Sequence, residues 1–201
     1  VTGVQTCALP IYFLRLIMSS SRDSQSQSKF PIATEEPKHI LYIGGEGGMG
    51  KLYKRITEQT GHHSYSIDKG NWFELEDMTD KLDLVIVTVP INVTESVIER
   101  LKGRLSDETI LADFTSNKTK PINAMLEAHS GPVIGLHPMH GPDVANLSKQ
   151  LMVVCPGRDP DKADWFVKQC ELWGMRIINA RSEEHTSELQ SPCNLVCRLL
   201  L

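Results

Sequence analysis

The sequence predicts an α/β fold, a doubly wound and mostly parallel sheet with helices on both faces. Short apolar runs alternate with stretches whose apolar residues recur at helical spacing, which is the pattern of strand–helix units. A glycine-rich turn follows the first apolar run, and a carboxylate follows the second. Both features stand at the carboxyl ends of expected strands, where folds of this class bind their ligands.

The expected elements fill the chain from about residue 38 to residue 180 as one domain. Strands are expected at the short apolar runs, which are 39–43, 64–67, 84–89, 109–112, 133–136, 152–155 and 176–178. The run 84–89 is almost wholly apolar and β-branched, which predicts a strand buried on both faces. Helices are expected at 49–56, 93–101, 122–128 and 163–170, with Gly61 as the C-cap of the first and Asp159 and Pro160 capping the last.

Composition limits the possible functions. Of 201 residues, 40% are hydrophobic and 23% are charged, which is enough for a buried core and excludes disorder of the whole chain. The net charge of -4 gives no basic surplus, so no nucleic-acid partner is expected. The five cysteines form no disulfide or metal pattern, which predicts a cytoplasmic protein. Arg15 interrupts the apolar stretch 9–18, so no signal peptide is expected there. No run of about 20 apolar residues is present, so no membrane span is expected.

The two ends are expected to be translated sequencing adapter. One DNA word spells residues 1–11, and its reverse complement spells residues 181–191, with the usual adapter continuation accounting for most of the remaining tail to residue 201. Segments 1–11 and 181–201 are therefore expected to lie outside the fold. The polar run from residue 18 to residue 38 reads as a linker.

The glycine turn is typical of a Rossmann-type dinucleotide site. It contains Gly45-x-Gly47-x-x-Gly50 between a strand and a helix. We expect Gly45 to make the tight turn, Gly47 to let a pyrophosphate approach the backbone, and Gly50 to let the helix pack closely. The amides of Gly48 and Met49 belong to the helix N-terminus, which favours phosphate binding.

Asp68 favours NAD as the dinucleotide. It ends the second expected strand, where a carboxylate accepts hydrogen bonds from ribose hydroxyls and repels the 2′-phosphate of NADP, although Lys69 is adjacent. The same turn nearly completes a phosphate loop of nucleotide hydrolases, because Lys51 follows Gly50. That alternative requires Ser or Thr at the next position to hold magnesium, and this chain has Leu52.

A second group of candidate residues surrounds two histidines. His137 lies in a segment held by two prolines and two glycines after an expected strand, and a neutral imidazole there can accept a proton from a substrate hydroxyl. His140 is interpreted as a loop-packing residue, because no cysteine or carboxylate completes a zinc site with it. His129 shares a helical face with apolar residues, so a core or helix-end role stays open for it.

Ser116 and Lys118 follow another expected strand. A hydroxyl can orient a catalytic imidazole, and an ammonium can meet a substrate carboxylate. Spacing alone favours the simpler interpretation, an N-cap for Ser116 and a solvated charge for Lys118.

Taken together, the glycine turn, Ser116-x-Lys118 and the segments 87–94 and 129–142 resemble prephenate dehydrogenases. The resemblance covers residues 38–180 and is closest to the bifunctional chorismate mutase/prephenate dehydrogenases of tyrosine biosynthesis. It implies NAD-dependent oxidative decarboxylation of prephenate to 4-hydroxyphenylpyruvate. The residues it implies are His137 and Ser116 for catalysis, Lys118 with His137 for the substrate, and Val89, Pro90 and His129 for the cofactor, beside the glycine turn and Asp68.

The resemblance also implies that parts of the parent protein are absent. Residues 12–37 would be the remnant of a mutase helix and its linker. The helical domain that follows residue 180 in the family, forms the homodimer and supplies an arginine for the substrate carboxylate would be absent. The chain is then expected to bind cofactor at most. Arogenate as the substrate, a non-catalytic NAD-binding module and a nucleotide hydrolase are the alternatives.

Overall fold

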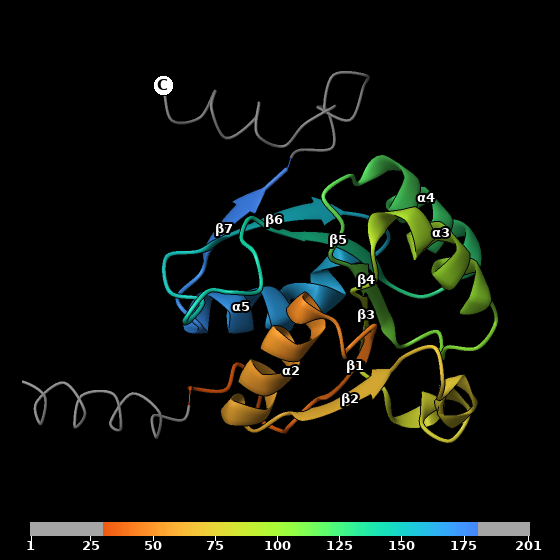
Figure 1. The fold of residues 1–201 in the computed structure, drawn as a ribbon, viewed down its shortest axis with the longest axis horizontal. Coiled ribbons are helices and arrows are strands. Elements are labelled where there is room, and N and C mark those ends of the chain that lie inside the picture. The colour runs from red at the N-terminus through yellow and green to blue at the C-terminus, as the bar shows by residue number, and fades with distance from the viewer. Residues whose placement is uncertain (1–29, 181–201) are drawn as a thin grey trace, which may run out of the picture. The chain divides into compact units, whose positions relative to one another are not determined.

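The computed structural model describes residues 30–180, which form a seven-stranded sheet with helices against both faces (Figure 1). The strands are β1 (His39–Ile43), β2 (His63–Ile67), β3 (Leu84–Val87), β4 (Ile110–Asp113), β5 (Val133–Pro138), β6 (Leu151–Pro156) and β7 (Arg176–Asn179). Both expected adapter-derived segments, 1–11 and 181–201, lie outside the described residues.

Four α-helices cover the described sheet, two on each face. They are α2 (Gly48–Thr60), α3 (Ile91–Arg100), α4 (Thr119–Ala128) and α5 (Asp164–Leu172), with short 3-10 turns at Trp72–Leu75, Thr79–Lys81 and Pro160–Ala163. Ile98 of α3 and Met125 of α4 belong to the same core cluster as Leu41. On the opposite face, the hydroxyl of Tyr42 is 2.7 Å from the Thr57 hydroxyl of α2. The fold is thus the predicted doubly wound one.

The strand order places a topological switch point at one edge of the sheet. The order is β2-β1-β3-β4-β5-β6-β7, and every neighbouring pair is parallel except β5 and β6. Strand β2 lies on one side of β1, and the chain then crosses over to place β3 on the other side of β1. The switch point therefore lies between β1 and β3, and folds of this class bind ligands at the carboxyl ends of such strands.

Helix α2 begins and ends at glycines. Gly47 precedes it in an extended conformation, and Gly61 follows it with a φ of 102°, so Gly61 is the C-cap that the sequence predicts. Leu52, Tyr53 and Ile56 form the buried face of the helix. Each contributes about 1.5–3 kcal/mol of apolar burial, which holds α2 and its N-terminus against the sheet.

Strand β3 ends two residues before the predicted run 84–89 does, and the backbone bends at Val89. The amide and hydroxyl of Thr88 both donate to the Ile43 carbonyl, at 2.8 and 3.0 Å. Pro90 then acts as the N-cap position of α3. The first residues after β3 are thereby held beside the end of β1.

Asp159 and Pro160 hold the expected N-cap and first positions, but of the 3-10 turn Pro160–Ala163 that leads into α5 and not of α5 itself. Asp159 adopts a φ of 44°, its side chain makes no capping hydrogen bond, and a 3-10 turn follows it before α5 begins at Asp164. Strand β5 also differs from expectation, because it continues to Pro138 and pairs with β6 in the antiparallel sense. His137, expected in a loop, therefore stands in the sheet opposite Val153. Within residues 30–180, no helix is long and apolar enough to cross a membrane.

Candidate active site

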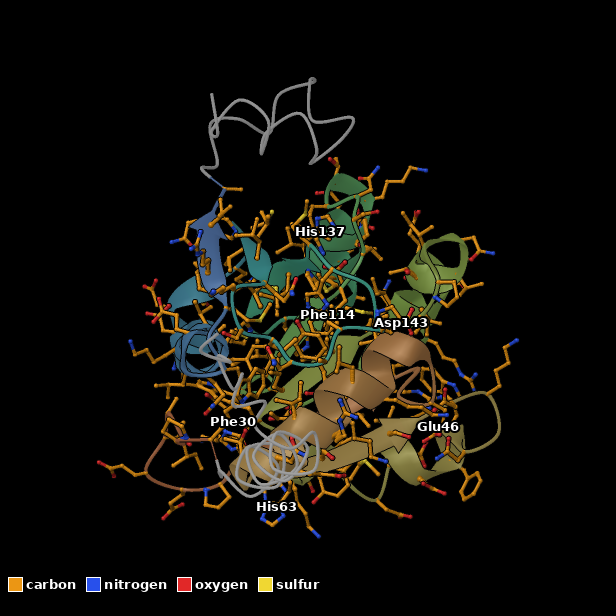
Figure 2. All side chains as sticks on the ribbon, turned by 60° about the vertical axis from the view of Figure 1, so that its left-hand side comes forward. Phe30, Glu46, His63, Phe114, His137 and Asp143 are labelled. Carbon is orange, nitrogen blue, oxygen red and sulfur yellow. The ribbon has the colours of Figure 1, made fainter. Side chains whose placement is uncertain are left out.

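The candidate residues that follow β1, β2, β3 and β4, together with His137 near the end of β5, lie at one edge of the sheet. These strands are parallel, so their carboxyl ends meet there. Figure 2 shows Glu46 of the glycine turn and His137 at separate places on the molecule, with Phe114 from the end of β4 between them.

The glycine turn is folded tightly by Gly44 and not by Gly45. Gly44 has a φ of 86°, and its amide donates to the Ile67 carbonyl at 2.7 Å. A Cβ at Gly45 would lie 2.4 Å from the Ser66 Cβ, so Gly45 permits close approach of the turn to β2. A Cβ at Gly50 would lie 2.6 Å from the Gly44 carbonyl oxygen, which confirms the predicted packing role of Gly50.

The N-terminus of α2 is open to an anion. Gly47 and Gly48 are exposed, and the first turn holds no acidic residue and no side-chain cap. Lys51 donates its amide to the Gly47 carbonyl at 2.8 Å, so the amides of Gly48, Met49 and Gly50 precede the first helical hydrogen bond. Such amides and the helix dipole favour a phosphate group.

The structure argues against the magnesium-dependent phosphate loop. Leu52 occupies the position that would need a hydroxyl, and its side chain is buried in the face of α2 that packs on the sheet. Lys51 pairs with Glu46 at 3.4 Å on the surface. The turn therefore offers backbone amides but no hydroxyl for a metal.

Asp68 stands beside the glycine turn, as the sequence predicts. Its carboxylate accepts a hydrogen bond from the Glu46 amide at 3.2 Å, and its own amide donates to the Asn71 side chain at 2.8 Å. The carboxylate is partly exposed at the end of β2. It can therefore accept further hydrogen bonds from a bound ligand.

Val89 and Pro90 follow β3 at the same edge of the sheet. A Cβ at Gly44 would lie 2.8 Å from the Cγ1 of Val89, so the segment after β3 touches the glycine turn. Pro90 is exposed at the start of α3. The structure thus brings both residues to the edge where the resemblance expects the cofactor.

His137 is half-buried in β5, and its Nδ1 is a buried atom without a hydrogen-bond partner among the described residues. Burial and, to a smaller extent, the positive charge of Lys118 together lower the pKa of His137 to about 4. The ring is therefore neutral near pH 7. A neutral imidazole is the form that accepts a proton.

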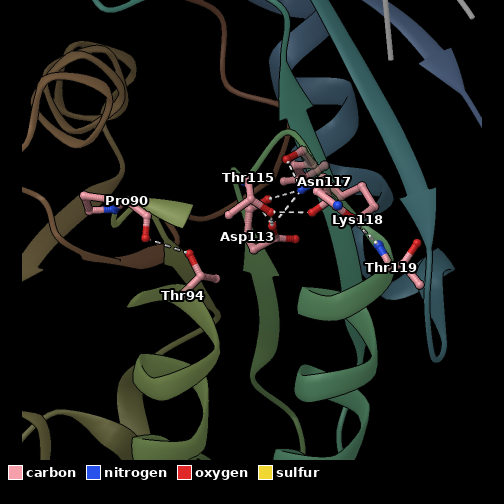
Figure 3. A network of polar contacts seen from close by, with 8 residues as sticks. Pro90, Thr94, Asp113, Thr115, Asn117, Lys118 and Thr119 are labelled. Carbon is pink, nitrogen blue, oxygen red and sulfur yellow. Dashed lines mark hydrogen bonds and ion pairs between the residues drawn. The ribbon is translucent and has the colours of Figure 1, made fainter. Parts of the chain in front are cut away.

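Lys118 does not sit as the sequence suggests. Its side chain is 9% exposed, and its Nζ lies 2.7 Å from the Asp113 Oδ2 and 2.6 Å from the Leu136 carbonyl oxygen (Figure 3). The Asp113 carbonyl oxygen is a further acceptor, at 3.2 Å. All three N–H donors therefore have partners inside the protein, so neither a direct substrate contact nor a solvated charge describes Lys118.

Asp113 is the polar residue of this edge that sequence reasoning missed. It is fully buried at the end of β4, and its Oδ2 also accepts hydrogen bonds from the amide and hydroxyl of Thr115. Its Oδ1 has no partner among the described residues. The sequence does contain a sign of its role, because Asp113 ends an otherwise apolar strand. A charge buried at such a place needs a partner.

Ser116 is exposed in the turn between β4 and α4. It is not the N-cap of α4, because that position is Lys118, and Asn117 instead accepts the Thr119 amide at 3.3 Å. Ser116 thus lies on the correct edge of the sheet, and its catalytic role stays a prediction.

The expected cofactor role of His129 is not supported by its position, which we correct here. His129 is buried at the end of α4, and its Nε2 is 2.7 Å from the Thr109 carbonyl oxygen, just before β4 begins. The amino ends of parallel strands lie at the edge opposite the glycine turn. His129 is therefore a helix-end histidine, which was the alternative interpretation. The guanidinium of Arg158 donates a hydrogen bond to its carbonyl oxygen.

His140 packs the connection between β5 and β6 onto α2. Its Nε2 is 3.0 Å from the Tyr53 hydroxyl, and its Nδ1 is 2.8 Å from the Gly141 carbonyl oxygen. A Cβ at Gly48 would lie 2.9 Å from the Pro142 ring, so the same connection also touches the start of α2 and leaves Gly48 exposed. The glycine turn and the segment after His137 are thus in contact.

Comparison with known proteins agrees with this geometry. Residues 55–181 match the family described as prephenate dehydrogenase, nucleotide-binding domain. The chain is 38% identical over 176 residues to the T-protein of Enterobacter agglomerans, which covers 88% of this chain and 47% of that protein. It is 39% identical over 172 residues to the T-protein of Haemophilus influenzae, covering 86% and 46%. The chain thus spans about half the length of these relatives.

Solved structures share the fold. A crystal structure of prephenate dehydrogenase from Aquifex aeolicus, in complex with hydroxyphenyl propionate and NAD+, superimposes with a TM-score of 0.63 at 17% identity. The match covers 76% of this chain and 63% of that one. From its sequence and its fold, this chain belongs to the family of prephenate dehydrogenase nucleotide-binding domains.

Proposed function

We propose that this chain is the NAD-binding part of a prephenate dehydrogenase, an enzyme that converts prephenate to 4-hydroxyphenylpyruvate by oxidative decarboxylation. The observation that carries the proposal is that three groups lie at one edge of the sheet. They are the helix N-terminus with its free backbone amides, the Asp68 carboxylate and the neutral His137. A dinucleotide needs the first two groups, and oxidation of an alcohol needs the third.

The chain's residues fit the cofactor by their donor chemistry. The amides of Gly48, Met49 and Gly50 would hold the pyrophosphate, and Asp68 would accept the ribose hydroxyls. Val89 and Pro90 would lie beside the cofactor next to the turn. When bound, NAD+ supplies the hydride acceptor of the reaction.

His137 would accept the proton of the ring hydroxyl of prephenate as hydride leaves the same carbon. Carbon dioxide is then lost and the ring becomes aromatic, which makes the conversion strongly downhill. The low pKa of His137 keeps its ring unprotonated and able to act as acceptor. Ser116, exposed on the neighbouring turn, would help to orient the hydroxyl.

Calorimetric titration tests the cofactor. We expect NAD+ to bind the 201-residue chain and ATP with magnesium not to bind. The reverse result would assign the turn to a nucleotide hydrolase. Because prephenate carries two carboxylates and Lys118 is internally paired, we expect the isolated chain to show little prephenate-dependent NADH formation.

Catalysis is tested in the chain extended to the full length of its relatives. His137→Asn should lower kcat by about 10²- to 10⁴-fold and leave NAD+ affinity unchanged, because it removes the proton acceptor but not the phosphate site. Full activity in this variant would favour a role for the domain in NAD binding alone. Parallel assays with arogenate distinguish the two related substrates.

We further propose that the longer protein is a cytoplasmic homodimer. The described cysteines, Cys155 and Cys170, are free thiols, which suits a reducing compartment. The homodimer rests on the family resemblance. Light scattering of the extended protein should give twice the mass of one chain, and a monomer would contradict this proposal.

A further inference from the structure

The aliphatic part of Lys118 passes over Gly135 toward His137. A Cβ at Gly135 would lie 3.0 Å from the Cδ of Lys118 and 2.9 Å from the Cδ1 of Ile122, so the glycine leaves the space that the lysine occupies. Beyond Gly135, the Nζ reaches the Leu136 carbonyl oxygen at 2.6 Å. This side chain therefore ends at the peptide group that joins Leu136 to His137.

Asp113 holds Lys118 in this position. Its Oδ2 is 2.7 Å from the Nζ, and the pair is almost wholly shielded from water, with side chains 9% exposed for Lys118 and 0% for Asp113. Thr115 donates its amide to the same carboxylate oxygen, at 3.0 Å. A buried pair with these additional hydrogen bonds has little freedom to rearrange.

The pair and the histidine face the same side of the sheet. Asp113 is aligned with Gly135 in the parallel pairing of β4 and β5. Side chains alternate along a strand, so His137, two residues after Gly135, points to the same face as Asp113. The Oδ1 of Asp113 and the Nδ1 of His137 are both buried without partners among the described residues.

We propose that Lys118, held by Asp113, is a positioning residue for His137: it fixes the backbone that precedes the histidine and places a buried positive charge on the same face. The proposal rests on the proposed function, in which His137 accepts a proton. Lys118 then acts through the histidine and need not touch the substrate.

The charge has a definite chemical effect. A nearby cation disfavours the imidazolium, so Lys118 acts with burial to lower the pKa of His137. The other titratable groups around this site are Asp113 on β4, Cys155 on β6 opposite Gly135, and His140 on the following connection. Burial raises the pKa of Cys155, so its thiol stays neutral. Lys118 is therefore the cation that adds to burial in disfavouring the protonated form of His137.

NMR titration of the histidine rings in the 201-residue chain tests the proposal without cofactor or substrate. His137→Gln identifies the His137 signal by its disappearance. In Lys118→Met the midpoint of the His137 titration should move upward, toward the ordinary value of about 6.5. In Lys118→Arg, which keeps the charge, the midpoint should stay low.

A folded Lys118→Met chain whose His137 titrates as in the parent overturns the proposal. So does an arginine variant that titrates like the methionine variant. If Lys118→Met does not fold because Asp113 is left unpaired, the double variant Asp113→Asn, Lys118→Met removes both charges and is read by the same criterion. A separate measurement of NAD+ binding distinguishes the two proposals. Failure of a variant to bind NAD+ would challenge the proposed function, whereas the pH titration of His137 would still test the role of Lys118.

Discussion

The Nζ of Lys118 lies 2.6 Å from the carbonyl oxygen of Leu136, so a side chain from the start of α4 terminates on the backbone next to His137. A lysine at the carboxyl edge of such a sheet would usually be read as a ligand for an incoming anion. Here its hydrogen bonds are completed inside the protein, and its charge acts on a neighbouring side chain. The substrate carboxylates of the proposed reaction therefore do not have Lys118 as a free cation.

Gly135→Ala should destabilise the domain by about 1–3 kcal/mol, because the new methyl group overlaps Lys118 and Ile122. Urea unfolding measures the loss. Gly70→Ala is the matched control, since nothing lies within 4 Å of a Cβ there, and it should change stability by less than about 0.5 kcal/mol. Equal stabilities for the two variants would mean that Lys118 does not pack over Gly135.

Gly44→Ala should cost more than Gly61→Ala, although both positions have positive φ values, 86° and 102°. Each substitution carries the left-handed strain of about 1–2 kcal/mol. Only Gly44 adds a clash, because its Cβ would lie 2.8 Å from Val89, whereas Gly61 has open space. Thermal melts of the two variants give the difference, and a larger loss at Gly61 would contradict the close contact of the turn with β3.

Asp68→Asn should weaken NAD+ binding about 10- to 100-fold, which corresponds to the loss of one charged hydrogen bond of about 1.5–3 kcal/mol. Binding of NADP+ should weaken less or improve, because the repulsion of its 2′-phosphate is removed. Calorimetry with both dinucleotides checks this. Asp77→Asn, at an exposed position, should leave both affinities unchanged.

Acid should destabilise the domain through His137 before most carboxylates titrate. Its pKa is about 4 in the fold and about 6.5 in the unfolded chain, so the unfolded state takes up the proton first as pH falls. Above about pH 6.5, His137 is neutral in both states and does not lower the free energy of unfolding. As the pH falls toward 4, protonation of His137 in the unfolded chain lowers that free energy. Urea unfolding from pH 7 to pH 4 should therefore show a smaller decline for His137→Gln than for the parent chain. His39 and His62, whose pKa values are also lowered by burial, titrate in both proteins and cancel in the comparison.

The fold was predictable because its signals are local. The apolar run at β3 is buried at every position, and Gly61 caps α2 as its place in the pattern indicates. Asp68 likewise reaches the glycine turn, since the ends of adjacent parallel strands must lie together. The pairing of β5 with β6 was not visible, because the direction of a strand leaves no trace in its apolar pattern.

The site was harder to predict because burial of polar groups is a tertiary property. Lys118 looks like a solvated or ligand-binding charge until Asp113 and the space at Gly135 are seen together. His129 has the same chemistry as His137, yet the helix that carries it ends at the opposite edge of the sheet. Sequence spacing does not distinguish these two edges for a residue that ends a helix.

The chain reversal between β5 and β6 links the two halves of the site mechanically. Since the connection stays at the edge where it begins, His140 and Pro142 rest on α2 within a few residues of His137. The helix start that would receive a diphosphate and the strand that bears the imidazole are therefore joined by one packed segment of the polypeptide.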